Sequence, residues 1–307
     1  MRDAVTLPTG VLVAFGAAGV RLLTADGRVK ARWQVPADRL VVADHGHSAL
    51  LLVHGERLIE AHRLDLRTGQ VRRGACLPQV VVADTFDGSI LPVLDPDGLV
   101  LVDTLGVVGG SPAAVDQPRT VWREFERGVT VHALSRREDR LSALVSGESV
   151  GVDGKPQLWT WSIPGMTLRA RRPVVLSTAS HGPITSLALG AGTGLLVLHG
   201  EAAPPLLQWH PATYHPVREL DAEHVVGVAA AGPHLALRRT SSQGQVVDVL
   251  TVDSPESPPA LRVEIPGADD LRLRHHGQVI TVHDGAGRVV DADLGTRRVV
   301  ANLTVRG

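Results

Sequence analysis

The amino-acid sequence predicts an all-β protein: a seven-bladed β-propeller of four-stranded antiparallel blades that forms one domain over residues 1–307. Two observations predict this fold. Apolar segments of roughly four to eight residues, bounded by Gly, Pro, Asp or Ser, follow one another along the chain, as short strands do. Units of strand, tight turn and returning strand recur about every 45 residues, which is the length of one propeller blade. No stretch combines helical periodicity with capping signals.

Repeated short motifs in the sequence support a period of about 45 residues. The tetrapeptide Val-Val-Ala-Asp at residues 41–44 returns at residues 81–84. Three apolar segments end at a histidine: His54, His199 and His283. We expect these histidines at the ends of second strands in three different blades, each facing a turn; the alternative is a pH-sensitive rim for partner binding. Seven tight turns are expected near Gly27, Gly69, Gly106, Gly165, Thr213, Ser257 and Gly295.

The last repeat shows the expected order of strands from the axis outward. Its four strands are predicted at residues 270–274, 278–282, 288–293 and 299–305. Residues 3–7 supply the innermost strand of the first blade, so each blade is a contiguous piece of chain without strand exchange. Two insertions, residues 117–128 and 147–156, fall between strands, where added loop length costs little. Residues 122–127 are expected to form one helical turn.

Composition limits the possible function classes. Hydrophobic residues make up 44% of the chain and aromatic residues only 3%, so the core is expected to be aliphatic. A net charge of −1 gives no electrostatic footprint for nucleic acid or for an anionic membrane. The single cysteine, Cys76, excludes an internal disulfide framework. Because neither a signal peptide nor an apolar run of about 18 residues is visible, a cytoplasmic protein is expected.

Two segments carry a resemblance to a known family. In residues 180–189 a histidine precedes an apolar strand, and in residues 207–220 Trp209 precedes a turn. These segments resemble the WD repeat, in which a Gly-His pair precedes the innermost strand and a Trp-Asp pair ends the third strand. This chain departs from that pattern, because Ser180 replaces the Gly and His210 replaces the Asp.

Other repeats depart from the family in the opposite way. Asp65 and Asp291 keep the Asp, but Leu64 and Val290 replace the Trp. These repeats are also similar to simpler bacterial propeller repeats. Since only fragments of the family's polar network remain, aliphatic packing between blades is expected to replace it. The resemblance implies a non-catalytic scaffold for protein–protein interaction, with one or more proteins as partners.

The chain carries no motif for catalysis or for a cofactor. It has no G-x-S-x-G elbow, and the glycines of residues 106–110 open no phosphate-binding helix. His275 and His276 are adjacent on a strand and should point to opposite faces, so they form no metal site. One alternative stays open: a propeller hydrolase, similar to a lactonase or a phosphotriesterase, with a metal ion in the central channel. The acids and histidine that such a site would use are Asp38, Asp87, Asp221, His224, Asp269 and Asp270.

Partner binding is therefore expected on loops. The predicted face carries the connections between blades and the turns between second and third strands. Exposed Arg and Trp side chains are favoured contact residues in protein interfaces. The candidate partner-binding residues are Arg39, Arg57, Asp97, Trp122, Arg123, Glu124, His199, Arg238, Arg239, His283 and Arg288.

Overall fold

The fold was analysed in a computed structural model of the chain. The structure describes residues 1–43, 46–56, 58–78, 85–86, 90–95, 98–103, 119–123, 129–137, 140–147, 150, 156–162, 167–174, 184–190, 194–200, 206–211, 216–231, 234–251, 257–268 and 271–305. Within residues 74–128 it describes the backbone of the strands only. The described residues contain strands, turns and bends, and no helix among them is able to cross a membrane.

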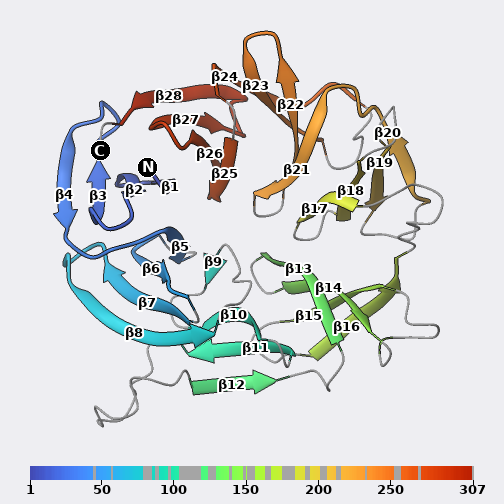
Figure 1. The fold of residues 1–307 in the computed structure, drawn as a ribbon, viewed down its shortest axis with the longest axis horizontal. Coiled ribbons are helices and arrows are strands. Elements are labelled where there is room, and N and C mark those ends of the chain that lie inside the picture. The colour runs from blue at the N-terminus through green and yellow to red at the C-terminus, as the bar shows by residue number, and fades with distance from the viewer. Residues whose placement is uncertain are drawn as a thin grey trace.

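In the part of the chain that the structure describes, six blades of four consecutive antiparallel strands surround a common axis (Figure 1). The first contains β1 (Asp3–Leu7), β2 (Gly10–Ala14), β3 (Val20–Leu23) and β4 (Val29–Trp33). The next contains β5 (Arg39–Ala43), β6 (Ser48–His54), β7 (Leu58–Asp65) and β8 (Val71–Pro78). Another contains β13 (Val129–Arg137), β14 (Arg140–Gly147), β15 (Gln157–Ser162) and β16 (Thr167–Pro173).

The remaining three blades follow in chain order. One contains β17 (Ile184–Gly190), β18 (Gly194–His199), β19 (Leu206–Pro211) and β20 (Arg218–Leu220). The next contains β21 (Val225–Ala231), β22 (His234–Ser241), β23 (Gly244–Val249) and β24 (Leu261–Pro266). The last contains β25 (Leu271–His276), β26 (Val279–Asp284), β27 (Arg288–Asp293) and β28 (Arg298–Thr304).

The prediction of seven four-stranded antiparallel blades is wrong. Between the β5–β8 and β13–β16 blades lies a sheet in which the described residues form three strands, β10 (Ile90–Asp95), β11 (Gly98–Asp103) and β12 (Arg119–Arg123). The two-residue β9 (Thr85–Phe86) does not join that sheet and pairs in parallel with β5. It thereby satisfies backbone groups on the axial edge of β5, which would otherwise have no partner strand.

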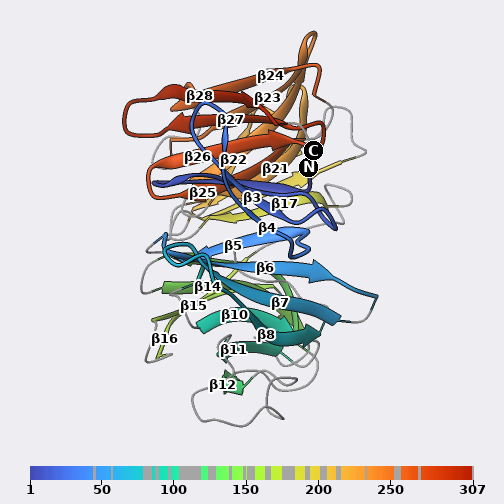
Figure 2. The same ribbon diagram turned by 90° about the vertical axis from the view of Figure 1, so that its left-hand side faces the viewer.

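The expected order of strands within a blade is confirmed. The four strands of the last blade lie within a few residues of their predicted positions, and their sheet order is β25-β26-β27-β28. The segment Asp3–Leu7 forms β1, which pairs with β2 inside its own sheet. The first and last blades therefore share no strand, and the two ends of the chain lie close together at their junction (Figure 1, Figure 2).

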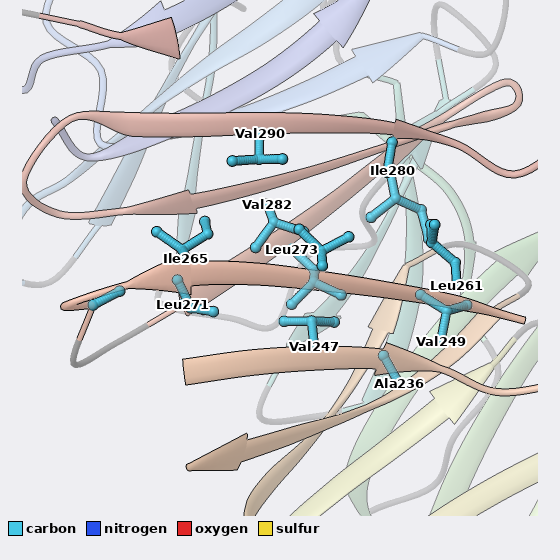
Figure 3. Close-up of a cluster of buried hydrophobic side chains, with 13 residues drawn as sticks. Ala236, Val247, Val249, Leu261, Ile265, Leu271, Leu273, Ile280, Val282 and Val290 are labelled. Carbon is cyan, nitrogen blue, oxygen red and sulfur yellow. The ribbon is translucent and has the colours of Figure 1, made fainter. Parts of the chain in front are cut away.

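Aliphatic side chains fill the spaces between blades, as the composition predicts. Figure 3 shows one such layer, in which Val247 of β23 packs beside Leu273 of β25 and Val282 of β26. Residues of β24 alternate strictly between buried and exposed, because successive side chains of a strand point to opposite faces. Its buried face packs toward the last blade, and each Val or Leu that is fully buried stabilises the fold by about 1.5–3 kcal/mol.

A buried carboxylate closes the ring between the last blade and the first. Asp3 of β1 is 1% exposed and accepts hydrogen bonds from Arg274 Nε at 2.9 Å and Arg274 Nη2 at 3.0 Å. The Nε2 atom of His283 lies 3.1 Å from Asp3 Oδ1. The backbone N–H of Leu40, on β5, donates to Asp3 Oδ2 at 2.8 Å. One side chain thus connects three blades in place of an exchanged strand.

Electrostatics favour the charged form of this carboxylate. Burial opposes the charge, but the Arg274 guanidinium and the hydrogen bonds with His283 and Arg274 hold the pKa of Asp3 well below its usual range. A second polar contact lies beside it. The Thr6 hydroxyl donates to Asp291 Oδ1 at 2.6 Å, and burial raises the pKa of Asp291. The ring closure therefore contains a polar network as well as aliphatic packing.

Candidate binding groove

A hollow lies over one face of the β21–β24 blade. It has a volume of about 640 Å³ and is bounded on its other side by β20 and the connection to β21. We call it the β20–β24 groove. Its lining residues are Glu219, Leu220, Asp221, Glu223, His224, Leu237, Arg239, Thr240, Ser241, Val246, Asp248, Leu250, Ser257, Pro258, Pro259, Arg262 and Glu264.

Strand lengths explain why this face is open. The outermost strand β20 has three residues, whereas β24 in the next blade has six. The alternation along β24 turns Arg262 and Glu264 to the face opposite the aliphatic layer, and both are exposed. A strand as short as β20 does not cover that face, so the groove remains between the two blades.

The groove combines an apolar floor with a charged rim. Leu237, Val246 and Leu250 are no more than 8% exposed and form the floor. Along the rim lie four exposed carboxylates, which are contributed by β20, by the connection to β21 and by β24: Glu219, Asp221, Glu223 and Glu264. Such a mixture of apolar surface and a few polar groups is typical of binding sites.

A buried ion pair anchors the charged wall. The side chain of Asp248, on β23, is 4% exposed and accepts hydrogen bonds from Arg262 Nε at 2.6 Å and Arg262 Nη2 at 3.0 Å. The Nε atom of Arg239, on β22, lies 3.2 Å from Asp248 Oδ2. Hydrogen bonding to Asp248 raises the pKa of the Arg262 guanidinium. The two arginines are therefore held in place by a carboxylate beneath them.

Arg239 also fixes the connection between β20 and β21. Arg239 Nη2 donates to the backbone carbonyl of Asp221 at 3.2 Å, and Nη1 donates to that of Glu223. The Asp221 carboxylate accepts a hydrogen bond from the Glu223 N–H at 2.9 Å. His224 has a φ of 59°, a left-handed conformation that is uncommon for residues other than glycine. These contacts fix the backbone that carries two of the rim carboxylates, Asp221 and Glu223.

Among the predicted partner-binding residues, Arg239 lies in the groove and the other described arginines do not. Arg238 is its neighbour on β22 and is partly buried, near Gly227. Arg39 begins β5 and is also partly buried. Arg288 begins β27, where its Nη1 atom donates to the backbone carbonyl of Pro266. The structure therefore spreads these arginines over several blades.

The prediction that His199 and His283 lie on a partner-binding surface is wrong. His199 is 0% exposed and His283 is 1% exposed, so neither side chain is available to a partner. Both end or nearly end second strands as predicted, but these strand ends lie in the interior, and His283 contacts Asp3. Of the three expected rim histidines, only His54 is exposed.

The remaining predicted contacts fall wholly or partly outside the described residues. Arg57, Asp97 and Glu124 lie outside them. The backbones of Trp122 and Arg123 are described and belong to β12, so the predicted helical turn is wrong for these two residues. Their side chains are outside the description.

The residues considered for a hydrolase do not gather into one described site. Asp221 and His224 line the groove, whereas Asp38 accepts a hydrogen bond from the backbone N–H of His54 at 3.1 Å. Within the described ranges, no group of three His, Cys, Asp or Glu residues is placed to hold a metal ion. The other three acids considered for that site, Asp87, Asp269 and Asp270, lie outside the described residues.

Sequence reasoning missed the acidic residues of the groove except Asp221, which it considered only for a hydrolase site. Asp248 sits in an apolar strand, where it reads as an isolated polar residue, although its partners Arg239 and Arg262 lie on the flanking strands. The alternation Leu-Arg-Val-Glu-Ile in β24 was the available signal, because it places Arg262 and Glu264 on one face. Recognising the groove also required the short length of β20, which the sequence does not display.

Comparison with solved structures identifies the architecture. A chain of KlHsv2, with loop 6CD replaced by a Gly-Ser linker, has a TM-score of 0.59 at 11% identity and covers 99% of both chains. The complex of KlAtg21 with the coiled-coil of AgAtg16 gives a TM-score of 0.55 at 10% identity over 99% of this chain and 100% of that chain. The fold is a β-propeller.

Other similar propellers differ in kind. A chain from work on two prolyl endopeptidases has a TM-score of 0.60 at 14% identity and covers 97% of this chain but 47% of that chain. A eukaryotic initiation factor gives 0.53 at 11% identity over 99% of this chain and 87% of that chain. No protein-family model and no curated protein matches the sequence. At these identities the propeller fold is shared, and fold alone does not determine activity.

Proposed function

We propose that this propeller is a non-catalytic platform that binds a partner protein at the β20–β24 groove. The observation that carries the proposal is the groove itself, in which an apolar floor lies beside a rim of fixed charges. The floor consists of strand residues and the rim is held by Arg239, so the surface is already formed before a partner binds. A pre-organised surface loses less conformational entropy on association.

The solved propellers support the same kind of role. KlAtg21, whose chain superposes along its full length, was solved in complex with a coiled-coil. Propellers expose loops on two faces while their sheet edges stay short and protected, which suits them to recognition. The groove includes Arg239, one of the residues that the sequence places among partner contacts.

Site-specific photo-crosslinking tests this proposal in the full chain. A photoreactive amino acid replaces Glu264 in the groove, and a matched variant carries it at Lys30, an exposed position on β4 of another blade. The partner protein that crosslinks to the photoreactive residue at position 264 is identified and purified. Its binding to the unmodified propeller is then measured by titration calorimetry. We expect saturable one-to-one binding and adducts from position 264 that are absent from position 30.

Two results would contradict the proposal. Equal adducts from positions 264 and 30 would mean that the groove is not selective. A crosslinked protein that shows no measurable affinity for the purified propeller would mean that the contact was accidental.

A further inference from the structure

We propose that the β20–β24 groove binds a basic segment of its partner protein, which carries several Lys or Arg side chains. This inference rests on the proposed function and adds the chemistry of the partner. The charges of the groove and its apolar floor support it.

Charge selects a cationic segment. Carboxylates outnumber guanidinium groups among the lining residues, by five to two. Both guanidinium groups already face the buried Asp248, and Arg239 also binds two backbone carbonyls. Glu219, Asp221, Glu223 and Glu264 are exposed around the opening. Two of them already have a neighbouring group: Asp221 Oδ2 lies 3.7 Å from Arg239 Nη1, and Glu223 Oε1 lies 3.5 Å from His224 Nε2. The groove therefore presents a negative potential, which attracts cations and repels phosphates and acidic peptides.

The floor favours a cation with an apolar stem. Lys and Arg side chains bury their methylene groups along apolar surface while the charged end stays near water. Leu237, Val246 and Leu250 supply that surface at the base, and the carboxylates stand at the rim above it. A small inorganic cation would contact only the rim carboxylates and would make no contact with the apolar floor.

Fluorescence anisotropy of labelled peptides tests this inference directly. The probes are two fluorescein-labelled peptides of nine residues, one alternating Arg with Val and the other alternating Glu with Val. The proteins are the full unmodified chain, the groove variant Glu223→Gln with Glu264→Gln, and a control variant with the same charge change elsewhere, Asp26→Asn with Glu56→Gln. All four substituted residues are exposed. Circular dichroism and thermal melting verify that each variant is folded.

We expect the Arg-Val peptide to bind the unmodified chain and the control variant alike, and to bind the groove variant about tenfold more weakly, since two exposed charge pairs are lost. The Glu-Val peptide should not bind. Equal weakening in both variants would overturn the inference, because it would indicate attraction to the molecule as a whole. Tight binding of the Glu-Val peptide would also overturn it.

The outcome separates this inference from the proposed function. If the Arg-Val peptide fails to bind but a purified partner crosslinks at position 264 and binds one-to-one, the partner's chemistry is wrong and the platform function stands. If neither binds, both proposals fail.

Discussion

Two buried aspartates of this propeller pair with arginine, but their structural roles differ. Asp3 gathers its contacts from β5, β25 and β26, which belong to two other blades. Asp248 faces Arg239 and Arg262, which lie on neighbouring strands of its own sheet. The same chemistry therefore joins blades at one place and shapes the wall of a groove at another.

Exposure of the cation separates the two sites. The side chain of Arg274, which binds Asp3, is 19% exposed, whereas that of Arg262 is 55% exposed. Water screens the Asp248 pair more strongly, so its contribution to stability should be smaller. A buried carboxylate between blades, such as Asp3, therefore stabilises the ring. A buried carboxylate beneath an open face, such as Asp248, mainly positions neighbouring side chains.

Of the substitutions proposed below, loss of the Asp3 charge should lower the free energy of unfolding most. Asp3→Asn removes the carboxylate that faces Arg274 and His283, and breaking a buried pair of this kind costs about 3–5 kcal/mol. Urea unfolding at neutral pH measures the change, with Asp26→Asn as an exposed control. A loss no larger than that of the control would show that Asp3 does not hold the junction.

The same contribution should depend on pH. The pKa of Asp3 is lower in the folded chain than its ordinary value near 4, so folding favours the deprotonated form. Its stabilisation is complete above that ordinary value and is lost as pH falls below about 4 toward the folded pKa. The difference between the unmodified chain and Asp3→Asn in urea midpoints should shrink between about pH 5 and pH 3. A difference that stays constant over this range contradicts the assignment.

Asp248→Asn should have an intermediate effect on stability. The amide keeps an acceptor for Arg262 or Arg239 but removes the charge between them, which should cost about 1–3 kcal/mol. Urea unfolding measures it, and Glu264→Gln serves as a control on the same face. If the loss equals or exceeds that of Asp3→Asn, the proposed distinction between the two aspartates is wrong.

The smallest effect is expected at Asp291. Burial raises the pKa of this carboxyl, so its charge is disfavoured in the folded chain, opposite in sign to Asp3. Asp291→Asn keeps an oxygen for the Thr6 hydroxyl, and the free energy of unfolding at neutral pH should change by less than about 1 kcal/mol in either direction. A thermal melt and a urea titration check this, and a loss as large as that at Asp3 would rule it out.

The sequence predicted the β-structure and the order of strands within blades well, because these depend on local patterns. Gly27 and Gly69 lie in turns between paired strands where they were expected, whereas the turns expected near Gly106, Gly165 and Thr213 lie outside the described residues. The parallel pairing of β9 with β5 depends on which chain segments meet in space, and no local pattern encodes it. This pairing is one respect in which the described sheets differ from the predicted seven four-stranded blades.

The candidate site was less predictable than the fold. Arg239 was identified because arginine is common in interfaces. Of the four rim carboxylates, only Asp221 was considered, and then for a hydrolase site. His199 and His283 were expected on the surface because they end apolar segments, but burial at a strand end is decided by the neighbouring blade. The Asp3 network was invisible for the same reason, since Arg274 and His283 lie 271 and 280 residues from Asp3 in sequence.

Each four-stranded blade of this protein is one uninterrupted piece of chain, and no strand is exchanged at the closure. A gene encoding such a ring can gain or lose about 40 codons and thereby gain or lose a whole structural unit, without leaving an orphan strand. Propellers that exchange a strand lack this freedom at their seam, because altering either end of the coding sequence breaks a shared sheet. The layout thus makes the number of units open to change by simple duplication or deletion.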